Sequence, residues 1–255
     1  MNLEQYLPLK VFEILMVFAR AGSAMLMLPG IGETFVPVRV RLLLSAVLAL
    51  AVAPTIAPQL PPEPTSAAGL LALLAGEVLI GIYFGLVSRI LLLTLDTTGR
   101  IISFSSGLAS ATIFNPSITE QGTAIGLILT MLGILLLFIT DLHHLVIRAV
   151  VESYAVFRPG GELMFGDLSE AVTELVAGSF KVAVQLSAPF YVFSLLFFVC
   201  LGVLARLMPQ LQIFFIGLPV QIYVGMLVLA TILGAMMTAF LTYYADTAAT
   251  YLIPN

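Results

Sequence analysis

The chain has 255 residues, of which 60% are hydrophobic and 9% are charged, whereas soluble domains average about 45–50% apolar and about 25% charged residues. This composition is typical of an integral membrane protein, and the length allows several spanning segments of about 20 residues but no separate soluble domain of useful size. The net charge of -4 includes no basic cluster suited to nucleic acid, and a single cysteine, Cys200, excludes an internal disulfide and a CxxC motif.

Six segments are apolar enough to form helices of spanning length: residues 9–28, 40–57, 69–95, 122–147, 186–207 and 219–242. The Pro-rich stretch 53–66 cannot be helical throughout and marks a connection. Residues 148–186 read as a longer polar connection, whose second half has the spacing of an amphipathic helix leading into the fifth segment at Pro189. We therefore expect an all-α integral membrane protein, a single domain of about six hydrophobic helices with broken segments and hairpins.

Four charges would face lipid if the first and third segments simply spanned a bilayer: Glu13, Arg20, Glu77 and Arg89. A charge at the bilayer centre costs roughly 2.5–3.5 kcal/mol, so these side chains must pair, reach an interface or face other protein. Glu77 and Arg89 also lie on one helix stripe with Gly81 and Gly85, and glycines four residues apart let another backbone approach closely. The stripe is a candidate subunit contact; packing within the chain is the alternative.

Asp141, His143 and His144, near the end of the fourth segment, raise the question of a metal site or proton relay. Adjacent histidines point to different faces of a helix and no HExxH spacing is present, so a helix end at the membrane surface is the favoured interpretation. Because the sequence contains no nucleophile elbow, phosphate loop or dinucleotide fingerprint, we expect no enzymatic activity, cofactor or metal. A secondary transporter is the alternative, since broken helices and buried charges are typical of that class, although no internal repeat is visible.

Three stretches resemble one family: LPGIGETFVPVRVRLLLSA at 28–46, GRIISFSSGLASATIFNP at 99–116, and 205–226 with its core RLMPQLQIFFIGLPVQI. Their order, their spacing and the chain length are similar to the FliR/SctT export-gate family of type III secretion along essentially the whole chain. FFIGLPVQI is more similar to the flagellar branch than to the injectisome branch, which remains an alternative.

The resemblance implies a subunit of the flagellar export gate in the bacterial inner membrane, within the flagellar basal body. It implies a helical hetero-oligomeric pore built with FliP and FliQ, with FlhB and FlhA as further partners and unfolded proteins as substrates. It also implies that residues 101–118 form a plug that closes the pore at rest. From composition alone, an ordinary re-entrant or surface segment is about as consistent with this uncharged stretch. The implied plug residues are Phe104, Ser106, Gly107, Leu108, Phe114, Asn115 and Pro116.

A hairpin tip is expected at 205–226, where Pro209 ends the fifth helix and Pro219 suits the first turn of the sixth. Non-helical backbone at membrane depth must be buried in protein or line an aqueous cavity, so the tip needs partners. A plain helical hairpin with a Pro-rich turn is the alternative. The predicted subunit contacts at the tip are Pro209, Gln210, Phe214, Phe215 and Pro219.

Overall fold

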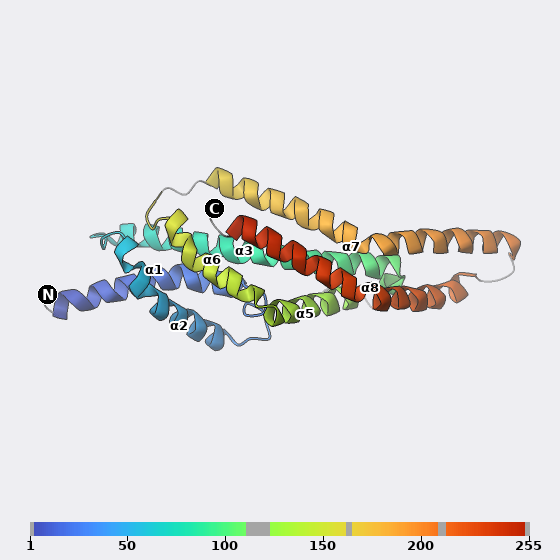
Figure 1. The fold of residues 1–255 in the computed structure, drawn as a ribbon, viewed down its shortest axis with the longest axis horizontal. Helices are drawn as coiled ribbons and strands as arrows, with labels where there is room; N and C mark the ends of the chain where they lie inside the picture. The colour runs from blue at the N-terminus through green and yellow to red at the C-terminus, as the bar shows by residue number, and fades with distance from the viewer. Residues whose placement is uncertain (1–2, 111–122, 162–164, 209–212, 253–255) are drawn as a thin grey trace. The chain divides into compact units, whose positions relative to one another are not determined.

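The computed structural model describes the backbone of residues 3–110, 123–161, 165–208 and 213–252 (Figure 1). Within these ranges all regular secondary structure is helical. The elements are α1 (Leu3–Met27), α2 (Val38–Ile56), η1 (Ala57–Gln59), α3 (Ala67–Ser105), η2 (Leu108–Ser110), α5 (Ala124–Ile139), α6 (Leu142–Val156), α7 (Phe165–Leu207) and α8 (Ile213–Leu252).

The chain forms two compact units, and α3, α5, α7 and α8 each contribute to both. The first comprises Met1–Leu91, Leu137–Leu175 and Tyr244–Asn255; the second comprises Leu92–Leu136 and Val176–Tyr243. These shared helices explain why the sequence shows no linker between the units.

In the first unit, α1 packs along α2, and α6 covers their contact. A core cluster joins the three helices through Val17, Ala49, Ala53, Ile56 and Tyr154. The link between α1 and α2 is held by Arg41, whose guanidinium donates to the carbonyls of Val36 (3.1 Å) and Gly32 (3.3 Å). An arginine of the stretch 28–46 thus orders the loop that precedes its own helix.

In the second unit, small residues bring helix backbones close together. Gly99 of α3 lies directly against the backbone of Gly126 in α5, where a Cβ would overlap it. The end of α3 also meets α7, because the hydroxyl of Thr98 is 3.5 Å from the Ala183 carbonyl oxygen. Close helix contacts of this kind are typical of membrane helix bundles.

The six predicted segments fall on helices, but most boundaries differ. Helix α8, for example, runs from Ile213 to Leu252 where residues 219–242 were predicted. The segment 122–147 is broken: α5 ends at Ile139, Asp141 takes a left-handed conformation (φ 58°), and α6 continues to Val156 through residues read as a connection. The third helix runs ten residues further than predicted, to Ser105. The amphipathic helix and the fifth segment form one helix, α7, that passes through Pro189.

Polar residues lengthen α3 because they are satisfied within the helix. Arg100 pairs with Asp96 one turn earlier (2.8 Å), and the Thr98 hydroxyl donates to the Thr94 carbonyl (2.7 Å). Pairs four residues apart stabilise a helix, so a polar stretch does not by itself end one.

Four of the described helices are long and apolar enough to cross a membrane, within residues Val38–Gln59, Ala67–Ser105, Phe165–Leu207 and Gly217–Leu252. The sharply bent pair α5 and α6 passes the same test together and raises the number to five. The protein is therefore an all-α integral membrane protein, as expected.

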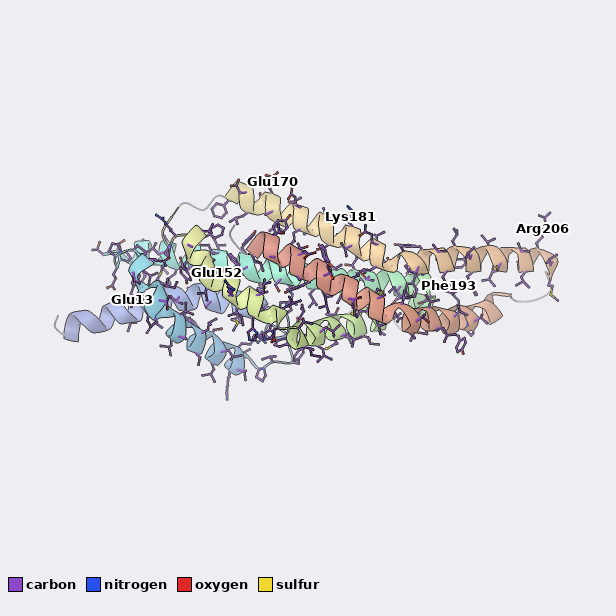
Figure 2. All side chains as sticks on the ribbon, viewed as in Figure 1. Glu13, Glu152, Glu170, Lys181, Phe193 and Arg206 are labelled. Atoms are coloured by element: carbon purple, nitrogen blue, oxygen red, sulfur yellow. The ribbon has the colours of Figure 1, made fainter. Side chains whose placement is uncertain are left out.

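Among the four candidate spans in the described part of the chain, α7 has the least buried apolar window. Only 6% of its most apolar 18-residue window is buried within the chain. Figure 2 shows its side chains projecting from the helix between Phe193 and Arg206. Large side chains more than half exposed on this part of α7 include Val192, Leu195, Leu196, Phe198, Val199 and Val203.

Candidate functional site

The end of α3 lies inside the segment that resembles a plug. Helix α3 continues to Ser105, so residues 101–105 are helical and not a loop. The N–H of Ser106 donates to the Ile102 carbonyl (2.8 Å), and Gly107 then takes φ 78°. Glycine adopts this left-handed conformation without steric penalty and commonly ends helices in this way.

Helix α8 holds this helix end through Gln221. The Gln221 side-chain amide donates to the Ser105 carbonyl (2.9 Å), and the residue is 5% exposed. Its carboxamide also lies against Gly107, where an added Cβ would be 3.2 Å away. One turn later on α8, Gly225 lies very close to Ser106. A Cβ added at Gly225 would be 2.7 Å from the Cβ of Ser106. Gln221 and Gly225 together form a seat for the turn after α3.

The seat separates buried from protruding residues of the predicted plug. Ser106 and Gly107 are buried and Leu108 is half-buried, whereas the Phe104 ring is 80% exposed. The exposed Phe104 ring therefore lies next to a turn that Gln221 and Gly225 hold in place. Phe114, Asn115 and Pro116 lie outside the described residues.

The structure corrects one part of the predicted hairpin tip. Helix α8 begins at Ile213, so Pro219 lies inside the helix and not in its first turn. A proline inside a helix removes one hydrogen bond and can bend the helix without ending it. Pro209 and Gln210 lie outside the described residues, and of Phe214 and Phe215 only the helical backbone is described.

The predicted stripe on α3 meets α1 of the same chain. Arg20 is fully buried and forms a two-pronged ion pair with Glu77, with N···O distances of 2.8 and 2.9 Å. The same guanidinium donates to the Ser153 hydroxyl (3.0 Å) and the Phe157 carbonyl (2.9 Å), and its Cζ lies 3.8 Å from the centroid of the Tyr154 ring. We call this set the Arg20 clamp; it joins α1, α3 and the end of α6.

The two glycines of the stripe let α1 approach α3. A Cβ at Gly81 would overlap the Arg20 carbonyl oxygen and the Ser23 hydroxyl. A Cβ at Gly85 would be 2.5 Å from the Met27 Cβ and 2.8 Å from the Ala24 carbonyl oxygen. The structure thus favours the intramolecular alternative for Glu77, Gly81 and Gly85.

Arg89 ends the stripe and stays partly accessible. Its guanidinium is 3.7 Å from a Glu33 carboxylate oxygen in the link between α1 and α2. The side chains are 38% and 21% exposed, so this pair is a surface contact and contributes little to stability.

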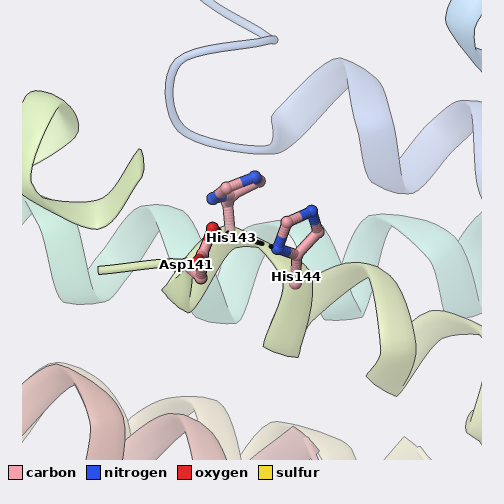
Figure 3. A group of neighbouring side chains, drawn as sticks. All are labelled: Asp141, His143 and His144. Atoms are coloured by element: carbon pink, nitrogen blue, oxygen red, sulfur yellow. Dashed lines mark ion pairs between the residues drawn. The ribbon is translucent and has the colours of Figure 1, made fainter. Parts of the chain in front are cut away.

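The polar group at the break between α5 and α6 is compact (Figure 3). One ligand atom from each of Asp141, His143 and His144 lies within 4.8 Å of the others. The expected helix end is present, but the two imidazoles do not diverge: their ring centroids are 4.0 Å apart. The argument from helix faces therefore does not hold for this pair of side chains.

Two functional contacts were missed from the sequence. The pairing of Arg20 with Glu77 was not predicted, since periodicity shows which residues share a face but not which faces meet. Gln221 was not among the residues singled out at the predicted tip. The sequence did contain a signal for this contact. Gln221 is a polar residue on an apolar helix, four residues before Gly225, and this pattern indicates a polar contact where another backbone comes close to the helix.

The fold and these contacts define a helical integral membrane protein whose polar residues bind its helices to one another. Residues 11–247 match the family "Bacterial export proteins, family 1". The chain belongs to this family of bacterial export proteins.

Curated relatives are similar over most of their length. The chain is 38% identical over 237 residues to the flagellar biosynthetic protein FliR of Caulobacter vibrioides, covering 93% of this chain and 94% of the relative. It is 29% identical to FliR of Escherichia coli, covering 89% and 85%. It is also 26% identical to the secretion system apparatus protein SsaT of Salmonella typhimurium, covering 71% and 70%.

Proposed function

We propose that this chain is a subunit of the flagellar type III export apparatus and lies in the bacterial inner membrane, within the flagellar basal body. The observation that carries the proposal is the 38% identity to a flagellar FliR over 93% of the chain. The similarity to SsaT is lower and covers less of the chain, which favours a flagellar over an injectisome role.

In this proposal, FliP and FliQ form the pore with the chain, FlhB and FlhA are further partners, and unfolded proteins are the substrates. The bare apolar surface of α7 supports a subunit role, because such a surface must face lipid or other protein. The resemblance of the three sequence stretches supports the identity of the partners.

Deletion of the gene tests the export role. The deletion strain should neither swim nor secrete flagellar proteins, and a plasmid copy should restore both. The chain should also co-purify with FliP and FliQ. A deletion strain that swims normally would overturn the flagellar role, and loss of effector secretion alone would support the injectisome alternative.

The proposal assigns residues 101–118 to closing the pore at rest. Its support is the anchored turn after α3 with the exposed Phe104 ring beside it. The Gln221 hydrogen bond contributes roughly 0.5–1.5 kcal/mol net, so an arriving substrate can displace the segment at a small cost. Closure therefore combines a defined resting position with easy opening.

Two changes test closure in the assembled complex. Gly107→Asp adds a side chain at a positive φ and a carboxylate against the Gln221 carboxamide; deletion of residues 107–112 removes the turn without adding charge. Both complexes should contain their partners and yet conduct small ions. Gly166→Asp is the control, since nothing lies within 4 Å of that position. Complexes that stay as ion-tight as the wild type after both changes would contradict the closing role.

A further inference from the structure

We propose that Asp141, His143 and His144 form a binding site for a divalent cation of the zinc class at the start of α6. The three ligand atoms lie within 4.8 Å of one another, and the side chains converge on one point of the surface (Figure 3). The site does not depend on the role in export.

The donor set indicates the class of cation. Two imidazole nitrogens and one carboxylate oxygen suit Zn²⁺ and neighbouring transition metals, whereas Ca²⁺ and Mg²⁺ prefer sets made of oxygen alone. Three protein ligands with an open fourth position also match the pattern of zinc sites that keep a water molecule. Asp141 and His144 are mostly exposed, so water can reach the fourth position.

The geometry needs only small side-chain rotations. Zinc bonds of about 2.0–2.2 Å at tetrahedral angles place two ligand atoms about 3.3–3.6 Å apart. His144 Nδ1 is already 3.3 Å from Asp141 Oδ1. The third ligand, from His143, has to approach by about an ångström, a shift within the range of rotamer adjustment.

The backbone brings the ligands together for a local reason. Among the described residues, Asp141 is the only one other than glycine that has a positive φ. This conformation turns its carboxylate back over the first turn of α6. The ring of His143 stacks on Phe138 at the end of α5, with centroids 4.5 Å apart, and its Nδ1 is 3.4 Å from the Leu137 carbonyl oxygen. The Asp141 carboxylate also offsets the partial positive charge of the helix N-terminus, which would otherwise oppose a cation. A bound ion would tie the start of α6 to the end of α5 through His143.

Zinc binding to the detergent-purified full chain tests the site. The protein carries a tag without histidine, is treated with a chelator and is dialysed against micromolar Zn²⁺, and bound zinc is measured by elemental analysis. We expect one Zn²⁺ per chain, with at least tenfold weaker binding in His143→Gln, His144→Gln and Asp141→Asn. Millimolar Mg²⁺ should not displace the zinc.

Matched controls separate this site from adventitious binding. Asp167→Asn removes an exposed carboxylate at the start of α7 and should leave zinc binding unchanged. Helix content, measured by circular dichroism, should be equal in all variants, and Asn tolerates the left-handed backbone at position 141. The proposal is overturned if the wild type binds less than half an equivalent, or if the double variant His143→Gln/His144→Gln binds zinc as tightly as the wild type.

Discussion

Arg20 is the residue on which the first unit depends most. Its guanidinium is fully buried and links α1 to α3 and to the end of α6 through four hydrogen bonds. A buried ion pair adds little stability compared with apolar residues of the same size, but an unpaired buried charge is strongly destabilising. The Arg20 clamp therefore makes the packing of α1 specific more than it makes it strong.

Glu77→Ala should destabilise the chain by about 3–5 kcal/mol, because it leaves the Arg20 guanidinium buried without its counter-ion. The expected result is a melting temperature lower by more than roughly 6 °C in detergent, and a lower yield. The double variant Arg20→Met/Glu77→Met should recover most of the loss, since no charge is left buried. A single variant with wild-type melting behaviour would show that the clamp is not needed for folding.

Gln221→Leu should loosen the turn after α3 without unfolding the chain. Leucine keeps the bulk of the side chain but cannot donate to the Ser105 carbonyl, and an unsatisfied buried carbonyl costs about 1–3 kcal/mol. In the assembled complex we expect a higher resting ion conductance with unchanged co-purification of partners. Gln185→Leu on the exposed side of α7 is the matched control. Equal conductance in wild type and Gln221→Leu would mean that this hydrogen bond does not hold the segment.

At the scale of elements, the close approach of α1 and α3 sets the geometry of the first unit. The approach needs both glycines of the stripe, and the same surface carries Glu77 into reach of Arg20. Sterics and electrostatics thus select the same pairing of helix faces, which leaves α1 a single register on α3.

Gly85→Leu should separate α1 from α3, whereas Gly76→Leu on the same helix should be tolerated. A side chain at Gly85 meets Met27 and the Ala24 carbonyl, while nothing lies within 4 Å of the Cβ position at Gly76. Overpacking of this kind costs about 1–3 kcal/mol or more. Thermal unfolding and limited proteolysis between α1 and α2 measure the difference. Similar stability of the two variants would contradict the packing described.

Helices were predictable from the sequence where apolar runs are long and uniform, as in α2 and α8. Boundaries set by local polar contacts were not: the Asp96–Arg100 pair extends α3 beyond its apolar run, and the backbone of Asp141 breaks a run that looks continuous. The candidate site divides in the same way. The resemblance placed Ser106 and Gly107 in the predicted plug but predicted no turn there, and the contact of Gln221 with Ser105 joins residues 116 apart and depends on tertiary packing.

At the scale of the whole molecule, the described part of α7 leaves a long apolar surface uncovered. The sequence suggested that unpaired charges would make the chain unstable alone, but Arg20 and Glu77 satisfy each other within the chain. The part of the chain that is not covered is the apolar part of α7. Only 6% of its most apolar 18-residue window is buried within the chain. The chain therefore needs partners or lipid to cover this apolar surface, and not to pair Arg20 and Glu77.

The chain purified alone in detergent should be polydisperse and less stable than its complex, and co-expression with FliP and FliQ should give a monodisperse, stable complex. Burial of the α7 surface is the expected cause, so Leu195→Asp, at an exposed apolar position, should weaken co-purification more than Thr173→Asp near the start of the same helix. Size-exclusion chromatography measures both effects. A monodisperse single chain that binds a small solute would favour the transporter alternative.

The Arg20 clamp also sets an order of events during synthesis. Ser153 follows Arg20 by 133 residues, so at about 5–20 residues per second roughly 7–27 s pass before this partner exists. Throughout that interval the guanidinium has no complete set of acceptors. We therefore expect α1 to reach its final place against α3 only once α6 has left the ribosome.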